Sequence, residues 1–197
     1  MILDCVIDGL LQYARPEILK EFRADSCIAS SAIGIDVLSH FGFISEPFPV
    51  QTIIFNQKMA DKVEKFGMPQ NGLPDAWVAE GAWSVGVGFG AEIAKPGKWQ
   101  AGHLNILAEN RYLIDLSIDQ ATRPQYQIDM TPFCIEVSDD FIQRNQARVF
   151  KYNDCFLRIV PFSNHDYSSS PDWCSKLRRA NVVRRTIEKI EKEYSHA

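Results

Sequence analysis

The sequence has no long hydrophobic run, so nothing in it predicts a membrane-spanning helix. A helix needs about 20 mostly apolar residues to cross a bilayer, and no segment of the 197 residues approaches that length. The N-terminal segment MILDCVIDGLLQYARPE carries Asp4 and Asp8, where a secretory signal would carry Lys or Arg. We therefore expect a cytoplasmic protein that does not bind a membrane.

The sequence also lacks an excess of positive charge. Its formal net charge is -4, whereas binding to nucleic acid draws most of its affinity from clustered Lys and Arg. The one basic cluster, Arg178-Arg179 with Arg184-Arg185, mixes with acidic residues in the C-terminal segment. This mixture is typical of the solvated face of an amphipathic helix, and we expect no nucleic-acid partner.

Motifs for disulfides, metals and phosphate binding are missing as well. The five cysteines are odd in number, widely spaced and free of any CxxC pair, and the histidines and cysteines show no metal-ligand spacing. The glycine run SVGVGFG at 84–90 is not followed by Lys-Ser or Lys-Thr, so a β-bulge or a flexible lid is a better interpretation than a phosphate loop. We expect no metal and no cofactor.

What the sequence does contain is a composition close to that of ordinary globular proteins, with 46% hydrophobic and 23% charged residues. A chain of this length buries one good core, so we predict a single domain over residues 1–197. Periodicity predicts helices at 2–11, 26–41, 58–66 and 172–194, with a short helix after Pro16 that reaches Phe22. It predicts strands at 50–55, 77–87, 133–137 and 156–160, and two strands within 103–117 that are separated by Glu109-Asn110. Helices followed by an antiparallel sheet and a closing helix indicate an α+β fold.

Cys27 is the residue that best fits a catalytic role. It follows Asp25 and Ser26, either of which can cap a helix. A thiol attacks as the thiolate, which the positive end of a helix dipole and a nearby imidazolium stabilise. Small residues behind Cys27 would let this helix pack closely on a sheet: Ala29, Ser30, Ser31, Ala32 and Gly34. Taken alone, Cys27 could equally be a buried structural cysteine.

His103 and Asp115 can supply the base and the group that orients it. If residues 108–110 form a three-residue turn, His103 lies directly opposite Asp115 on one face of a hairpin. The carboxylate would hold one imidazole nitrogen, and the other would exchange a proton with the thiol. An even-length turn would put the pair on opposite faces, and a longer turn would favour Asp119 over Asp115.

These residues resemble a known family. The segment GHLNILAENRYLIDLSIDQ, behind a helix that begins with Cys, is similar to the transglutaminase-like branch of the papain-like cysteine enzymes. There a His opens one strand, a turn follows, and the next strand ends in Asp with a small hydroxyl residue close behind. The resemblance covers residues 24–120 and implies Cys27 as nucleophile, His103 as general base and acid, and Asp115 as orienter. Arylamine acetyltransferases share this order of residues.

The chain departs from the family at two places. Ser26 stands beside the nucleophile and Leu104 follows the His, where the family often has Trp, and Trp99 lies four residues before the His instead. Protein crosslinker, peptidase and acyltransferase therefore all stay open.

A second cysteine site has less support. Asp172 can cap a helix with Cys174 in its first turn and His165 upstream, but no carboxylate is placed to align with His165. Three other cysteines lie in apolar patterns and are expected in the core: Cys5, Cys134 and Cys155.

We thus predict cysteine-dependent acyl transfer or amide hydrolysis through Cys27, His103 and Asp115, acting on a peptide or small-molecule acyl substrate. The backbone N–H of Cys27 is the expected oxyanion donor. Gln51, Asn56 and Gln57 are candidates for a second donor. The alternative is a non-catalytic interaction module with the same fold, and the sequence leaves the oligomeric state open.

Overall fold

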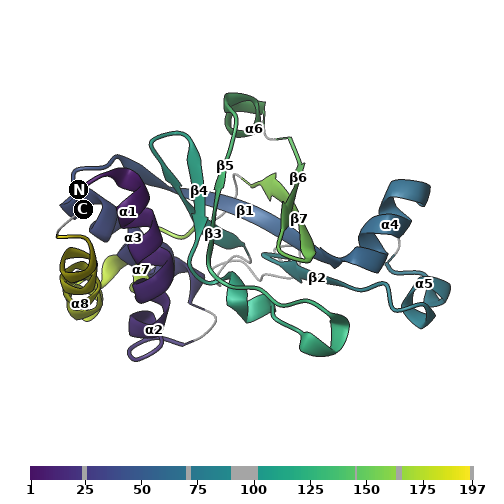
Figure 1. Cartoon of the computed structure of the whole chain (residues 1–197), viewed down its shortest axis with the longest axis horizontal. Coiled ribbons are helices and arrows are strands. Elements are labelled where there is room, and N and C mark those ends of the chain that lie inside the picture. Colours follow the sequence, from purple (N-terminus) through teal and green to yellow (C-terminus); the bar gives the residue numbers. More distant parts are fainter. Residues whose placement is uncertain (24–25, 70–71, 90–101, 145, 163–165, 196–197) are drawn as a thin grey trace.

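The protein has helices at one end, a curved antiparallel sheet in the middle and two short helices, α4 (Gln57–Phe66) and α5 (Asp75–Ala79), at the other end (Figure 1). The structure is a computed structural model that describes residues 1–23, 26–69, 72–89, 102–144, 146–162 and 166–195. This arrangement confirms the predicted α+β class.

The helical end is built around α3 (Cys27–His40). On it pack α1 (Leu3–Gly9), which continues through a π-helical turn (Leu10–Ala14) into α2 (Arg15–Ile18), and the long C-terminal helix α8 (Lys176–Tyr194). Helix α1 approaches α8 so closely that a Cβ on Gly9 would lie 2.6 Å from the Ile190 side chain. The apolar faces of these helices form one core with the sheet, which includes Val6, Leu10, Ile33, Val37 and Val182.

The sheet has the strand order β5-β4-β3-β1-β7-β6, and every neighbouring pair is antiparallel. Its strands are β1 (Ser45–Asn56), β2 (Ser84–Val87), β3 (His103–Ala108), β4 (Tyr112–Asp115), β5 (Phe133–Glu136), β6 (Arg148–Tyr152) and β7 (Cys155–Pro161). Strand β1 is long enough to pair β7 along one edge and both β3 and β2 along the other. The start of β3 and the end of β2 therefore meet beside the middle of β1.

Alternation along β3 and β4 divides their side chains between two cores. Ile106 and Ile114 pack with α3 in the helical core, whereas Leu107 and Leu113 belong to a second core enclosed by the curved sheet. Successive strand residues point to opposite faces. His103 and Asp115 consequently lie on the same face as Leu107 and Leu113.

Three sequence predictions need correction. The segment 77–87 is not one strand, because α5 and a turn through Gly81 at φ 83° precede β2. The C-terminal helix is interrupted at Ser175, whose ψ of 78° is not helical, so a short α7 (Pro171–Cys174) precedes α8. Strand β6 was not predicted, since RVFKY has a mostly exposed, charged pattern at the sheet edge.

Within the part of the chain that the structure describes, no helix combines the length and the apolar character needed to cross a bilayer.

Glu17 joins α2 to α8. Its buried carboxylate lies 2.8 Å from the Lys189 ammonium, 2.6 Å from Lys20 and 2.7 Å from the Arg185 guanidinium. Hydrogen bonds from Lys189 and Lys20 lower the pKa of Glu17 to about 2, against the opposing effect of burial. Charge-assisted contacts of this kind are among the stronger ones in proteins, and here they hold the C-terminal helix in place.

We predict that Glu17→Gln lowers the free energy of unfolding by about 2 kcal/mol at neutral pH, because it removes the charge that three cations share. The folded-state pKa lies below the ordinary 4.5. The stabilisation is therefore complete above pH 4.5 and is lost as the pH falls toward 2. Urea unfolding of the wild type and the variant over this range measures the convergence of the two stabilities.

Glu188→Gln is the matched control, because Glu188 pairs with Arg184 on the exposed face of the same helix. We expect a much smaller loss there. Equal losses in the two variants would contradict the role assigned to Glu17.

Candidate active site

Cys27 is the first residue of α3, as predicted. Ser26 occupies the N-cap position, but its hydroxyl donates to the Arg23 carbonyl at 2.5 Å instead of capping the helix. Asp25, the other predicted cap, lies outside the described residues. The first hydrogen bond of the helix runs from the Ser30 N–H to the Ser26 carbonyl, so the Cys27 N–H precedes the intrahelical ladder and points out of the helix start.

Small residues bring α3 close to β3, which confirms the packing inferred from the sequence. A Cβ on Gly34 would lie 2.3 Å from the Ile106 side chain. The Ser31 hydroxyl donates to the Leu104 carbonyl at 2.6 Å. This carbonyl lies beyond the last paired residues of β3 and β4, Ile106 and Ile114. The start of α3 is thereby fixed beside the start of β3.

His103 and Asp115 are in direct contact, and both side chains are fully buried. The distance from His103 Nε2 to Asp115 Oδ2 is 2.6 Å. Because a carboxylate only accepts, the Nε2–H donates to Asp115. Asp115 Oδ1 accepts from the Ser117 N–H at 2.9 Å, so both carboxylate oxygens are held.

The hairpin that brings this pair together has a different register from the one predicted. Ile106 pairs with Ile114 and Ala108 with Tyr112, so the three-residue turn is 109–111, with positive φ at its first two positions. The prediction that His103 lies directly opposite Asp115 is therefore wrong, and the two are diagonal neighbours. The contact is kept because a shift of two residues leaves side chains on the same face.

The pKa of His103 is raised to about 10. Burial disfavours the charged ring and lowers the pKa, but the charge and the hydrogen bond of Asp115, together with those of Cys27, outweigh it. Asp115 occupies Nε2, which leaves Nδ1 for the Cys27 sulfur. The Gln120 amide nitrogen also lies 3.5 Å from Nδ1, a contact that the sequence analysis did not anticipate.

The alternative carboxylate, Asp119, is engaged elsewhere. Its two oxygens face the Arg15 guanidinium, at 2.9 Å from Nε and 2.8 Å from Nη2. This ion pair links the helical end to the turn after β4, and Asp115 remains the partner of His103.

Two of the three candidates for a second oxyanion donor have other roles. Asn56 accepts from the Met59 and Trp83 N–H groups and donates to the Gly81 and Tyr126 carbonyls. Gln57 donates to Asp61 on the surface of α4. Gln51, the third, is half-buried in the middle of β1, where it faces Val160 of β7.

Asn105 lies on the same face of β3 as His103, two residues along. Its side chain is fully buried, and neither amide atom has a hydrogen-bond partner in the part of the chain that the structure describes. An unsatisfied buried amide is costly, and the sequence alone did not single this residue out.

A cavity of about 510 Å³ opens at Cys27. Phe22, Arg23 and Ile28 line it on the side of α2 and α3, and a segment more than 140 positions away in the chain supplies Ser170, Asp172 and Arg178. Local sequence patterns carry no information about this contact. Cys27 therefore lines an open cavity and also interacts with the buried pair of His103 and Asp115, so its thiol is accessible and has a base beside it.

The rival cysteine site is not supported by the geometry. The Cys174 thiol is exposed and donates to the Ser168 carbonyl at 3.2 Å, and His165 lies outside the described residues. Among the cysteines predicted to be structural, Cys155 is buried in the core, and Cys5 and Cys134 are half-buried. Burial raises the pKa of the Cys134 thiol to about 12, which makes it a poor nucleophile.

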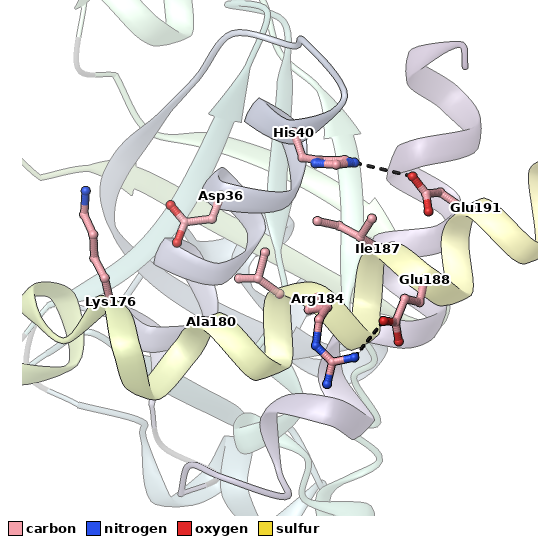
Figure 2. Close-up of a pocket in the computed structure, with 9 residues that line it drawn as sticks. Asp36, His40, Lys176, Ala180, Arg184, Ile187, Glu188 and Glu191 are labelled. Atoms are coloured by element: carbon pink, nitrogen blue, oxygen red, sulfur yellow. Dashed lines mark hydrogen bonds and ion pairs between the residues drawn. The ribbon is translucent and has the colours of Figure 1, made fainter.

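A second cavity, of about 530 Å³, lies between α3 and α8 (Figure 2). At its rim His40 lies 3.4 Å from Glu191, and Arg184 lies 2.7 Å from Glu188. Among the described residues, no cysteine, serine or threonine lines this cavity, so they offer it no nucleophile comparable to Cys27.

No known protein family, curated protein or solved structure matches this chain. The similarity to transglutaminase-like enzymes accordingly rests on the residues described above. Among the described residues, no group of three or more His, Cys, Asp and Glu side chains is placed to hold a metal ion.

Gly88 limits how His103 can be placed. It has a φ of 83°, and a Cβ on it would lie 2.7 Å from the His103 backbone nitrogen and 2.9 Å from the Val50 carbonyl. The glycine run at 84–90 thus contains one position where the absence of a side chain is needed for the site. Residues 84–87 of that run form β2, and Gly90, also part of the predicted β-bulge or lid, lies outside the described residues.

We predict that Gly88→Ala lowers the free energy of unfolding by about 3 kcal/mol, because a left-handed backbone and a clash with backbone atoms combine. Gly42→Ala is the control, since Gly42 has a φ of 85° but nothing within 4 Å of the added Cβ; a loss of about 1 kcal/mol is expected there. Chemical denaturation measures both variants. A loss no larger at Gly88 than at Gly42 would show that the strand junction tolerates a side chain.

A further prediction concerns the charge on His103. In Asp115→Asn the acceptor that raises the pKa is neutralised while burial persists, so the pKa of His103 is expected to fall from about 10 to below 6.5. Histidine ring signals in an NMR titration measure this shift. Ser117→Ala is the control, because it keeps the backbone N–H that Asp115 accepts.

The pair of His103 and Asp115 also determines how the stability of the fold changes with pH. Because folding raises the pKa of His103 above 6.5, the pair stabilises the fold fully below that pH and loses its contribution as the pH rises through about 10. An unchanged His103 pKa in Asp115→Asn would contradict the assignment of Asp115 as its partner.

Proposed function

We propose that the protein is a cysteine-dependent acyltransferase or amide hydrolase. The observation that carries this proposal is the interaction of Cys27, at a helix start, with the His103 ring, which is itself bound to the buried carboxylate of Asp115. A nucleophile, a base and a group that orients the base are the parts that covalent acyl transfer requires. The resemblance of residues 24–120 to transglutaminase-like enzymes agrees with this order.

The proposed reaction begins when the Cys27 thiol gives its proton to His103 Nδ1 and the sulfur attacks the carbonyl carbon of the substrate. A carbon–sulfur bond forms as the π electrons of the carbonyl move to its oxygen. The carbonyl oxygen takes the negative charge and is stabilised by the outward-pointing Cys27 N–H. The carbonyl then re-forms and the bond from its carbon to the leaving group breaks, while His103 gives its Nδ1 proton to the leaving group and keeps its Nε2 bound to Asp115. Water or an amine, deprotonated by His103, releases the acyl group from sulfur.

Gln120 is a better-placed candidate for the second oxyanion donor than Asn56 or Gln57. Its amide nitrogen lies beside His103 Nδ1, the ring nitrogen that is left for Cys27. Asn56 and Gln57 are bound elsewhere. In this proposal Gln120 replaces them as the donor.

A cytoplasmic location forms part of the proposal. All five cysteines are free, and free thiols persist in a reducing compartment. A nucleophilic thiol of this kind also requires that compartment, or a protected site, to stay reduced.

The direct test is acylation of Cys27 by a reactive ester such as 4-nitrophenyl acetate, followed by acid quenching and intact-mass and peptide analysis. We expect one acetyl group on Cys27 in the wild type and none there in Cys27→Ala. His103→Gln should slow acylation by about 100-fold or more, because it removes the base. Cys174→Ala is the matched control and should react like the wild type.

Two outcomes would overturn the proposal. Acetylation of Cys174 in preference to Cys27 would move the chemistry to another site. A Cys27 that reacts at the slow rate of an ordinary thiol at neutral pH would favour a non-catalytic interaction module with this fold.

A further inference from the structure

The cavity at Cys27 has a cationic wall. Arg23 and Arg178 line it together with one acidic residue, Asp172. Among the described residues, the other side chains that line it are not ionised Lys, Arg, Asp or Glu. A neutral acyl group needs no such wall, whereas an anionic one would gain from it.

Arg178 is held in place by contacts that do not use up its donors. Its guanidinium lies 4.4 Å from the centroid of the Phe22 ring, and Phe22 is itself nearly buried. Its Nη2 donates to the Glu21 carbonyl at 2.8 Å. Stacking on an aromatic ring and binding to a backbone carbonyl orient the planar group without neutralising its charge.

The contact of Arg178 with the carboxylate of Asp172 is a long one. Asp172 Oδ1 lies 3.4 Å from Arg178 Nη1, whereas charge-assisted contacts are commonly about 2.7–2.9 Å. A guanidinium has five N–H donors, and among the described residues the contacts of Arg178 with Glu21 and Asp172 engage two of its nitrogens. A second carboxylate can therefore approach from the cavity, either beside Asp172 or in its place.

We propose that the acyl group accepted by Cys27 carries a carboxylate and that Arg178 selects it. This inference rests on the proposed function, since it specifies the substrate of that same site. Arg178 does not touch the reacting carbonyl. It acts as a specificity residue that binds the far end of the acyl group and so places the carbonyl at the sulfur.

The location of Arg178 also explains why the C-terminal helix belongs to the site. Arg178 lies in the first turn of α8, and the Glu17 cluster fixes the same helix two to three turns later through Arg185 and Lys189. The Arg178 side chain is 51% exposed, so its position depends on the contacts that it makes. Here the helix, the Phe22 ring and the Glu21 carbonyl define its position.

The test uses two thiol reagents that differ only at their far end, N-iodoacetylglycine and its carboxamide. The Cys27 sulfur displaces iodide from both, forming the same carbon–sulfur bond, so intrinsic reactivity is matched. Rates of labelling at Cys27 are measured by peptide mass spectrometry and divided by the rates with glutathione. In the wild type we expect the acid to react about fivefold faster than the carboxamide, and this preference to shrink at high salt.

Arg178→Gln should abolish the preference for the acid, so that the two normalised rates become equal, and urea unfolding of the variant reports whether the fold is intact. Arg178→Lys keeps the charge but loses the planar fork, and an intermediate preference is expected. Arg184→Gln is the matched control, because Arg184 is on the same helix and pairs with Glu188 away from this cavity. It should behave as the wild type.

The outcomes separate this inference from the function beneath it. Fast labelling of Cys27 with equal normalised rates for the two reagents, or a preference that persists in Arg178→Gln, would overturn the carboxylate assignment and leave the nucleophile in place. Labelling of Cys27 no faster than glutathione by either reagent would overturn the proposed function, and the carboxylate assignment with it.

Discussion

An imidazole and a carboxylate that are both excluded from solvent lie 2.6 Å apart at one end of β3, and the surrounding structure satisfies their remaining polar atoms. Burying an ion pair costs more than it returns unless its geometry is good and its other hydrogen bonds are made. The Ser117 N–H holds the second oxygen of Asp115, and Cys27 and Gln120 face the second nitrogen of His103. Much of the fold can be understood as the set of elements that supply these contacts to His103 and Asp115.

Strand β1 provides the frame for that arrangement. Along one edge it pairs β3 up to Val50 and His103, and then β2 from Thr52 and Val87. The two shorter strands meet end to end, and Gly88 lets them do so without moving the His103 backbone. On the other side of β3, Ser31 uses the carbonyl that β4 leaves unpaired and brings the start of α3 to the ring.

The helical end connects stability to the proposed chemistry. Glu17 is buried among three cations, and two of them belong to α8. The same helix presents Arg178 to the cavity at Cys27, and Arg15 of α2 binds Asp119 just after β4. Interactions that hold the C-terminal helix therefore also shape the wall against which a substrate would lie.

The sequence by itself determined the local features of this protein: a helix that begins at Cys27, small residues that let it approach a sheet, an α+β order, and a hairpin that places His103 and Asp115 on one face. The hairpin prediction placed both side chains on one face although its register was wrong. This is because the register differs by two residues, and every second side chain along a strand points to the same face. Whether a turn begins at 108 or 109 depends on small conformational preferences that composition does not resolve.

Only the tertiary structure decided which distant groups complete the site. Arg178 and Asp172 reach the Cys27 cavity from the other end of the chain, Gln120 turns back onto the ring, and Asp119 is taken by Arg15. The break at Ser175 that positions α8 is likewise not visible as an interruption of the apolar pattern. Contacts between segments more than 100 residues apart depend on how whole elements pack. The local periodicity of the sequence does not specify that packing.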